Sequence, residues 1–445
     1  MMYANWKQFV GDPLMPKEWP RRARIGLNGF GQLARTLLRC ALEDNRGLDV
    51  VAINEPNLTP EQMIYLFKYD TNLGPFAGYI SERVEVAYAK EDQNGEYSNI
   101  QVAGRWIGVF HCKQPEDIPW NWLGVEYVLE MTGELRHLKE ATKHLTGGRA
   151  RKVLVVGDTV DIPLLMYPIS CRGYQRGTSV VASGSPMAHA VATIVSLVDE
   201  ICEMEDCMVT LVLPVGDCQN LIDGATKDAR NWRMGRAAKQ SIIPGRCPTV
   251  LQSVFQAIPK LNGRLNAITM HVPVFEGAVV DLTFRTMDVL NGVGDVVDRI
   301  TKNSLLLQYN DLHIKTQPFR DKGSCFSQLK KASSSASSMA DSVRRDSDQT
   351  LSQSSGPNVV AGTDINPTIQ MPDGLTSVLM PVNKEDAYVS SDTTAKHTLC
   401  LLSVDCCFGI PAGNTFKLVT WFDLGVSYCE RLLDTVVFMR SIDHI

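Results

Sequence analysis

The sequence has no uninterrupted apolar run near the ~20 residues that a membrane-spanning helix needs, so no membrane segment is expected. It also has no Cys-x-x-Cys pair, and its twelve cysteines are scattered, with Cys406 and Cys407 the only adjacent two. This excludes the usual zinc and dithiol motifs and a dense disulfide framework. A formal net charge of −5 argues against a strongly basic surface for nucleic acid. We therefore expect a cytoplasmic protein with free thiols that binds neither a membrane nor a specific nucleic acid.

The first 22 residues, Met1–Arg22, carry Trp6, Trp19 and three prolines, and they lack the apolar core of a secretory signal. We interpret them as an extra arm that packs on the body or docks a partner; a loose tail is the alternative. The chain has 445 residues, of which 44% are apolar and 21% charged. This length and composition suit two globular domains with cores of their own.

A glycine-rich corner, Arg24–Arg35, follows an apolar strand and leads into a helical pattern. Its Gly-x-Gly-x-x-Ala pattern predicts a dinucleotide-binding corner, in which Gly29 permits the tight turn and Gly31 lets the backbone approach a pyrophosphate. The free N–H groups at the helix start then face the phosphates. A second apolar strand ends in Glu55, about 20 residues past the glycines, where a carboxylate holds the ribose hydroxyls. The alternative is a plain βαβ corner with a surface glutamate.

Strand and helix patterns alternate as far as about Val181, which predicts a mostly parallel sheet with helices on both faces. The predicted strands are Arg24–Leu27, Val50–Asn54, Tyr127–Glu130, Val153–Val156 and Ser179–Ala182. The predicted helices are Glu61–Tyr69, Leu135–Leu145 with a Gly147-Gly148 C-cap, and Ala188–Glu203. The later runs Val209–Val215, Leu265–Pro273 and Val279–Met287 indicate long strands, and Gly425–Ile442 indicates a closing helix. The expected fold class is α/β: a Rossmann-type doubly wound parallel sheet followed by an α+β domain with a broad sheet.

These patterns divide the chain into an arm (1–22), a nucleotide-binding domain (23–185), a second domain (186–420) and a C-terminal helix (421–445). An insertion is expected at about 318–386. Within it, Ser324–Ser355 holds twelve serines and almost no large apolar residue, which predicts disorder. A basic pair ends two residues before Ser347, and we hypothesise that a basophilic kinase phosphorylates this serine. The alternative is an unmodified linker, and phosphosite mapping by mass spectrometry distinguishes the two.

Several longer motifs follow one another in a fixed order. They are Arg24–Arg35, Val51–Pro56, Met63–Asp70, Glu130–Gly133, Trp232–Arg236, Ile242–Pro244, Leu261–Gly263, Val279–Thr283 and Trp421–Asp423. Their order resembles that of the phosphorylating glyceraldehyde-3-phosphate dehydrogenases (GAPDH), over roughly Arg24–His313 and Val389–Met439. The resemblance implies the two-domain fold of that family, whereas activity depends on the residues of the site.

In that family a Cys thiolate attacks the aldehyde and a His takes the proton, and the resemblance assigns each a position. Here Pro186 stands at the Cys position and Leu213 at the His position. Proline offers no nucleophile, but it suits the first turn of a helix with Ser185 as its N-cap. We therefore assign no catalytic residue.

The phosphate sites that the resemblance implies are altered as well. Only one ligand of the inorganic phosphate, Ser185, matches; Met187, Cys247 and Pro248 replace Thr, Thr and Gly. At the site of the substrate phosphate, a Thr and an Arg are replaced by Gly216 and His271. Bidentate binding of phosphate by an arginine fork is hard to replace.

The NAD site that the resemblance implies is mixed. Its expected contacts are Asn28, Gly29, Phe30, Gly31, Gln32, Leu33, Asn54, Glu55, Thr132 and Gly133. Glu55 stands for the family's usual Asp, and Gln32 for an Arg beside the pyrophosphate. Near the nicotinamide, Val156-Gly157-Asp158 replaces Ser-Ala-Pro, and Leu424 replaces the Asn that holds the carboxamide. An amide left unpaired costs on the order of 1–3 kcal/mol, so we predict weak NAD binding led by the adenosine half.

Other side chains could have been recruited for catalysis. Ser185 and His189 lie four residues apart at a helix start, yet neither has an obvious orienting carboxylate. A capping serine beside a core or surface histidine is therefore the favoured interpretation. Cys218 and Cys247 fall near the altered pocket, where an isolated cysteine is more often a small core residue than a nucleophile.

The residues Trp232, Arg233, Arg236, Gln240 and Ile242–Pro244 match the loop that, in the family, reaches between neighbouring subunits. The resemblance thus implies a homo-oligomer, or a hetero-oligomer with GAPDH-like subunits; local packing is the alternative. The favoured hypothesis is a catalytically inactive homologue, a nucleotide-binding or structural subunit whose arm or serine-rich insertion binds an unidentified protein. The alternatives are a divergent NAD-dependent glyceraldehyde-3-phosphate dehydrogenase or related aldehyde oxidoreductase with an unrecognised nucleophile, and a sensor of nucleotide occupancy.

Overall fold

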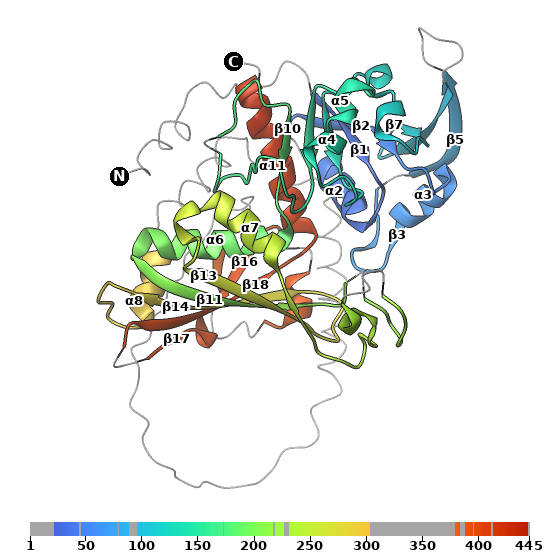
Figure 1. Cartoon of the computed structure of the whole chain (residues 1–445). Coiled ribbons are helices and arrows are strands. Elements are labelled where there is room, and N and C mark those ends of the chain that lie inside the picture. Colours follow the sequence, from blue (N-terminus) through green and yellow to red (C-terminus); the bar gives the residue numbers. More distant parts are fainter. Residues whose placement is uncertain are drawn as a thin grey trace, which may run out of the picture. The chain divides into compact units, whose positions relative to one another are not determined.

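Two large β-sheets with their helices make up the part of the chain that the computed structural model describes (Figure 1). This part comprises residues 22–43, 46–78, 80–88, 96–171, 173–216, 219–226, 231–302, 379–382, 388–394, 396–410 and 413–443. All of them belong to one compact unit of the chain, residues 1–312 with 376–445. The predicted arm up to residue 21, Cys218, and the serine-rich segment with Ser347 lie outside the described residues.

The first sheet is the predicted doubly wound sheet, in the order β10-β9-β8-β1-β2-β7-β6-β5. Its parallel strands are β1 (Ala23–Asn28), β2 (Leu48–Asn54), β7 (Arg105–Phe110), β8 (Tyr127–Glu130), β9 (Lys152–Val155) and β10 (Val180–Ala182). Two antiparallel strands, β6 (Glu96–Val102) and β5 (Ile80–Tyr88), extend it. The five strands predicted from the sequence are confirmed to within two residues at each end. They were recognisable because strands covered on both faces are nearly continuous apolar runs.

Helices cover both faces of this sheet. On one face, α2 (Gln32–Glu43) and α3 (Pro60–Lys68) share a hydrophobic cluster with Leu27 and Leu129. On the other face, Ala141 of α4 (Leu138–Ala141) packs with Val128 and Val153. A separate two-stranded sheet, β3 (Tyr69–Asp70) with β4 (Gly74–Pro75), follows α3.

The single helix predicted over Leu135–Leu145 is wrong, because the chain forms α4 and then α5 (Lys143–Thr146). Between them the Thr142 hydroxyl donates to the Leu138 carbonyl at 2.6 Å, a bond that bends helices. Gly147 does end α5, but in a right-handed conformation with φ −91°. A Cβ at Gly147 would lie 2.2 Å from the Glu116 carbonyl oxygen, so glycine is required here by close packing of the backbone.

The second sheet has the order β12-β13-β11-β14-β18-β16-β15, with β17 also paired to β18. Its strands are β11 (Met204–Leu213), β12 (Ile243–Arg246), β13 (Leu265–His271), β14 (Ala278–Thr286), β15 (Leu379–Val382), β16 (Cys400–Ser403), β17 (Phe408–Gly409) and β18 (Thr415–Phe422). Alternate residues of β14 and β18 are buried. The buried face packs against α6 (Pro186–Ile201), α7 (Pro248–Ala257) and α8 (Val293–Thr301) (Figure 1). The predicted broad sheet of an α+β domain is confirmed.

Two predicted boundaries differ from the structure. The insertion drawn at 318–386 contains β15, which pairs in parallel with β16, so the insertion ends earlier than predicted. Its serine-rich composition stops at Ser355, and the apolar run Leu379–Val382 is long enough to pair. The C-terminal helix drawn from residue 421 begins later, because Trp421 and Phe422 are the last residues of β18.

The C-terminal helix, α11 (Val426–Asp443), packs into the core of the first domain. Its Leu432 and Leu433 belong to the same hydrophobic cluster as Leu37 of α2. The buried Asp443 at its end accepts hydrogen bonds from Tyr127 and Tyr174 at 3.0 and 3.1 Å. The chain thus returns from the second sheet to the first, and this return brings the start of α11 beside the start of α6.

None of the helices in the described residues is long and apolar enough to cross a membrane. In the same part of the chain, no group of three or more His, Cys, Asp or Glu side chains is arranged to hold a metal ion.

Candidate nucleotide-binding and reaction site

The glycine corner after β1 leaves open space in front of α2. Gly29 has φ +99°, and a Cβ there would lie 3.2 Å from the Thr132 backbone nitrogen, so glycine is required. An added Cβ at Gly31, by contrast, meets no atom within 4 Å. Gln32 is exposed at the first turn of α2, which contains no acidic residue. The corner therefore fits a pyrophosphate held by the backbone at the N-terminus of α2.

Glu55 follows β2 and faces the same corner. Its Oε2 accepts the Phe30 backbone N–H at 3.1 Å, and its Oε1 accepts that of Asn57 at 2.9 Å. Each carboxylate oxygen has a further lone pair, so the group can still accept hydrogen bonds from two ribose hydroxyls. Glutamate thus fits the role of the family's aspartate.

The side chains of Asn28 and Asn54 are used within the protein. Asn54 Nδ2 donates to Asn28 Oδ1 at 2.8 Å and to the Cys112 carbonyl at 3.0 Å, while its Oδ1 accepts the Cys112 N–H at 2.9 Å. These bonds join the ends of β1, β2 and β7. The Phe30 side chain is buried in the core, and Leu33 packs against that core. At these four predicted contact positions, only backbone atoms remain to meet a cofactor.

A buried network beneath the corner was not foreseen from the sequence. Glu130 Oε2 accepts Asn28 Nδ2 at 2.5 Å and His144 Nε2 at 2.9 Å. Its Oε1 accepts the backbone N–H of Thr132 at 2.9 Å and also the Thr132 hydroxyl. The Trp120 indole donates to His144 Nδ1 at 3.1 Å, and since that N–H can only donate, the histidine proton lies on Nε2.

This network gives both oxygens of the Glu130 carboxylate, which is 1% exposed, hydrogen-bond partners within the protein. It holds Thr132, and thereby the turn at Gly133 with φ +74°, against the end of β1. A signal was present in the sequence: a glutamate ends the buried strand Tyr127–Glu130, where a charge needs several partners. Its partner His144 lies 14 residues further on and is placed by α5, so the pair could not be recognised without the fold.

On the reaction side, Pro186 is the first residue of α6. Ser185 is its N-cap, and the Ser185 hydroxyl accepts the Ala188 N–H at 3.2 Å, which confirms the predicted cap. Leu213 ends β11 and lies in the hydrophobic core, 4% exposed. The two positions therefore hold a helix-starting ring and a packed aliphatic side chain, and neither can exchange a proton.

The helix α7, like α6, has a proline at its first position. It starts at Pro248 after the N-cap residue Cys247, whose side chain forms no capping bond. Each of the two helix starts thus lacks the first N–H that could bind an anion. Burial, together with the negative charge of Asp158, raises the pKa of the Cys247 thiol to about 11. Cys247 is consequently protonated at neutral pH and is not a ready nucleophile.

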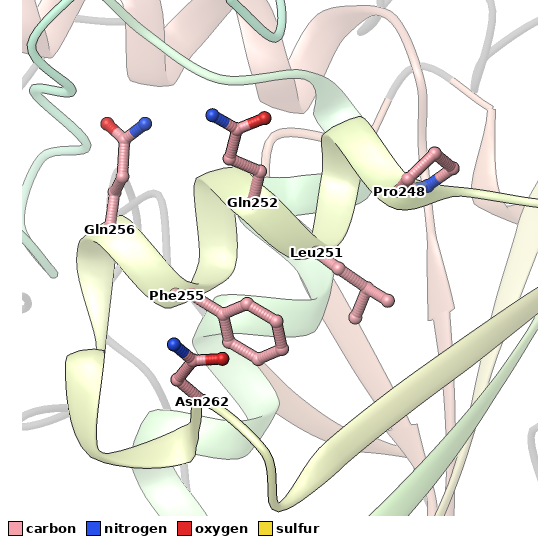
Figure 2. A pocket seen from close by; sticks show the side chains of 6 residues that line it. All are labelled: Pro248, Leu251, Gln252, Phe255, Gln256 and Asn262. Atoms are coloured by element: carbon pink, nitrogen blue, oxygen red, sulfur yellow. The ribbon is translucent and has the colours of Figure 1, made fainter. Parts of the chain in front are cut away.

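A surface hollow of about 520 Å³ lies along α7 (Figure 2). Its lining residues are Pro248, Leu251, Gln252, Phe255, Gln256 and Asn262. None of these side chains is titratable or nucleophilic. Gln252 Nε2 donates to the Val160 carbonyl at 3.2 Å, which ties α7 to the loop after β9. The hollow supplies no catalytic group.

His189 is a core histidine, as the sequence favoured. Its Nε2 donates to the Ser183 carbonyl at 2.9 Å, and its ring packs edge-on against Tyr428 of α11. Burial lowers the pKa of His189 to about 4. In the described residues no side-chain hydrogen bond joins Ser185 to His189, whose Nε2 is bonded to the Ser183 carbonyl, so the two form no catalytic pair.

The remaining predicted positions give no anion or amide site. His271 Nδ1 lies 3.2 Å from the Pro214 carbonyl, and the Gly216 N–H donates to Gln219. Leu424 is half-buried and packs against the core of the second domain. The glycine corner and Glu55 thus leave room and acceptors for a pyrophosphate and a ribose, whereas Leu424 adds only an apolar side chain to the core.

A parallel sheet whose first βα corner holds a tight glycine turn, an open glycine and a carboxylate suited to a ribose, followed by a broad α+β sheet, is typical of a dinucleotide-binding protein of the dehydrogenase type. Residues 23–138 match the family model described as glyceraldehyde 3-phosphate dehydrogenase, NAD binding domain, and residues 186–341 match the corresponding C-terminal domain. The chain belongs to the glyceraldehyde-3-phosphate dehydrogenase family, and its first domain is that family's NAD-binding domain.

Proteins named glyceraldehyde-3-phosphate dehydrogenase align with much of the chain. A glyceraldehyde-3-phosphate dehydrogenase of Schistosoma mansoni is 28% identical over 425 residues, 95% of this chain and 99% of that protein. The testis-specific enzyme of Rattus norvegicus is 35% identical over 262 residues, covering 59% of this chain and 56% of the rat protein. A cytosolic form from Zea mays is 32% identical, covering 59% of this chain and 74% of the maize protein.

Proposed function

We propose that this chain is a catalytically inactive member of the family, a pseudoenzyme that acts as a nucleotide-binding or structural subunit of an oligomer. The observation that carries the proposal is Pro186 at the first position of α6, with Ser185 as its cap. The helix start is preserved in its local geometry, while the side chain that would form a thiohemiacetal is absent.

The loss of a proton acceptor supports the same conclusion. Leu213 is buried at the end of β11, so an aldehyde bound nearby would find no base on that residue. The raised pKa of Cys247 argues against recruitment of this thiol in place of the missing one. A divergent aldehyde dehydrogenase would need a nucleophile from another part of the chain.

NAD binding in this proposal is led by the adenosine half. The open space at Gly31 and the Glu55 carboxylate suit the pyrophosphate and the ribose. Leu424 leaves the carboxamide without a partner, which costs on the order of 1–3 kcal/mol. ADP-ribose should therefore bind about as tightly as NAD.

Assembly into an oligomer is supported by the exposed apolar side chains of one segment. Trp232 and Ile242, in the stretch that resembles the family's intersubunit loop, are 81% and 66% exposed, and Ile222, which precedes this stretch, is 79% exposed. Large apolar side chains this exposed in one segment are typical of an interaction surface. We place the protein in the cytoplasm, with GAPDH-like subunits and an unidentified protein as its partners.

The experiment that tests the proposal is steady-state reduction of NAD with glyceraldehyde 3-phosphate and phosphate. We expect no turnover above the rate without protein, beside an active dehydrogenase as positive control. Turnover that disappears in a Cys247→Ser or Cys218→Ser variant would show a recruited nucleophile and refute the proposal.

A further inference from the structure

Asp158 lies between the start of α6 and the middle of α7. Its Oδ1 accepts the Ser185 backbone N–H at 2.9 Å and the Ser253 hydroxyl at 2.7 Å. Ser185 is the N-cap of α6, and Ser253 lies on α7 and is 2% exposed. One carboxylate oxygen thus joins the two helices through two hydrogen bonds.

The chain places this carboxylate by the ends of two parallel strands. β9 and β10 are neighbours, so Asp158 and Ser185, which follow them, emerge at the same edge of the sheet. Between β9 and Asp158, Gly157 has φ +120° and its N–H donates to the Ser183 hydroxyl at 3.3 Å. The Ser183 hydroxyl in turn lies 2.9 Å from the Tyr428 hydroxyl of α11, so the loop is held from three elements.

The donors at the start of α6 are largely taken by the protein itself. The Ser185 N–H goes to Asp158, the Pro186 ring nitrogen has no hydrogen, and the Ala188 N–H goes to the Ser185 hydroxyl. Within the described residues, no Lys or Arg forms an ion pair with Asp158. The positive end of the α6 dipole and these donors are therefore what stabilise the carboxylate.

We propose that Asp158 is an internal anion that occupies the space between α6 and α7 where a phosphate would otherwise bind, and that it excludes inorganic phosphate and phosphorylated ligands from this site. The inference rests on the proposed function, because an inactive subunit has no need to hold the phosphate of a reaction in this pocket. A negative charge fixed at this position repels an incoming phosphate and also uses the hydrogen bonds that would hold it.

Asp158 therefore determines the ligand class of the pocket, with consequences beyond phosphate. The same carboxylate acts on the nearby Cys247 and disfavours its thiolate. A single side chain thus opposes both the anionic substrate and an anionic nucleophile. Any ligand that enters this part of the pocket should be neutral or cationic.

The test is a titration with inorganic phosphate. Calorimetry and the shift of the melting temperature with phosphate concentration measure the affinity. Asp158→Ala releases the Ser185 N–H and the Ser253 hydroxyl, and we expect it to bind phosphate roughly tenfold or more tightly than the unaltered protein, the effect of about one charge-assisted hydrogen bond. Asp158→Asn keeps an oxygen acceptor in place and should gain much less. Asp161→Asn, three residues further on, is the matched control, because its Oδ1 instead accepts the Leu138 N–H at 2.9 Å.

Asp158→Ser, which removes the charge and leaves room for phosphate, gives the same readout if the alanine variant does not fold. Folded variants that bind phosphate no better than the unaltered protein overturn the proposal, and so does an unaltered protein that already binds phosphate as tightly as Asp158→Ala. These outcomes are independent of the NAD-reduction assay, so a failure here leaves the proposed loss of catalysis standing, and the reverse also holds.

Discussion

Pro186 fits the first position of α6 and carries no nucleophile. The first residue of a helix needs no N–H and favours φ near −65°, so the ring is accommodated there. Its effect could be read from the sequence, since a proline excludes a nucleophile in any fold. The role of Asp158 could not be read in the same way, because it depends on Ser185 and Ser253 arriving from two different helices.

Gly31 offers a residue-scale test that separates folding from nucleotide binding. We predict that Gly31→Ala changes the free energy of unfolding by less than about 1 kcal/mol, since an added Cβ meets no atom. NAD affinity should fall roughly tenfold or more, because the methyl group occupies the path of the pyrophosphate. Calorimetry and thermal unfolding measure the two quantities. Gly173→Ala, which has equal room away from the corner, should change neither, and an unchanged NAD affinity in Gly31→Ala would contradict the assigned phosphate position.

Leu424 is the residue expected to separate NAD from ADP-ribose. Leu424→Asn supplies a partner for the carboxamide, so NAD affinity should rise by up to the 1–3 kcal/mol that an unpaired amide costs. The affinity for ADP-ribose should stay the same, because that ligand has no carboxamide. Leu424→Ala serves as the control, since it removes the side chain without adding a polar partner. Equal effects of both substitutions on NAD would show that Leu424 does not face the nicotinamide.

At the scale of elements, the sequence predicted five strands of the first sheet and three of the second, missed the remaining strands and misjudged two segments. The five predicted strands of the first sheet were recognisable as apolar runs, whereas the sequence pattern did not mark the break between α4 and α5, where the Thr142 hydroxyl donates to the Leu138 carbonyl. Gly147 was correctly placed at a helix end, but glycine is required there by the close Glu116 backbone rather than by a C-cap conformation. The sequence could not show this, because Glu116 belongs to a distant segment. β15 was missed because its pairing with β16 bridges a long insertion.

The packing of α6 against α11 predicts a pH dependence of stability. His189 sits between these helices with a pKa held near 4 by burial, while a histidine in the unfolded chain titrates near 6.5. Between these values the unfolded state binds the extra proton, so stability is full above pH 6.5 and is lost as the pH falls toward 4, by about 3 kcal/mol. Denaturant unfolding at pH 7 and at pH 4.5 measures this loss. His189→Leu should flatten the difference, whereas substitution of the exposed His137 should leave it unchanged; an equal loss in His189→Leu would assign the effect to other groups.

At the scale of the whole molecule, the motif order predicted the two-domain fold that the family models identify. The order of the motifs could not show that α11 packs on the first domain. There Asp443 accepts hydrogen bonds from Tyr127 and Tyr174 and pairs with Lys152. Contacts between residues this distant in sequence depend on the complete fold. The same holds for the buried Glu130 and His144 beneath the nucleotide corner.

Assembly is the prediction that belongs to the whole molecule. Light scattering coupled to gel filtration should give a mass greater than that of one chain. Trp232→Glu should reduce it to that of a monomer, because a charge on an 81% exposed tryptophan at a contact surface is costly to bury. Trp106→Glu, on the exposed side of β7 in the first domain, is the control and should keep the oligomer. A strict monomer before any substitution would assign Trp232 and its neighbours to local packing.

The central claim, that the nucleotide corner is retained while the reaction chemistry is lost, is tested most directly by a single-turnover assay. The protein is mixed in excess over NAD with glyceraldehyde 3-phosphate and phosphate, and NADH is followed by absorbance, so that even one slow acylation per subunit is detected. The account predicts no NADH, because Pro186 and Leu213 provide neither the nucleophile nor the base. Formation of NADH up to the amount of NAD added would contradict it.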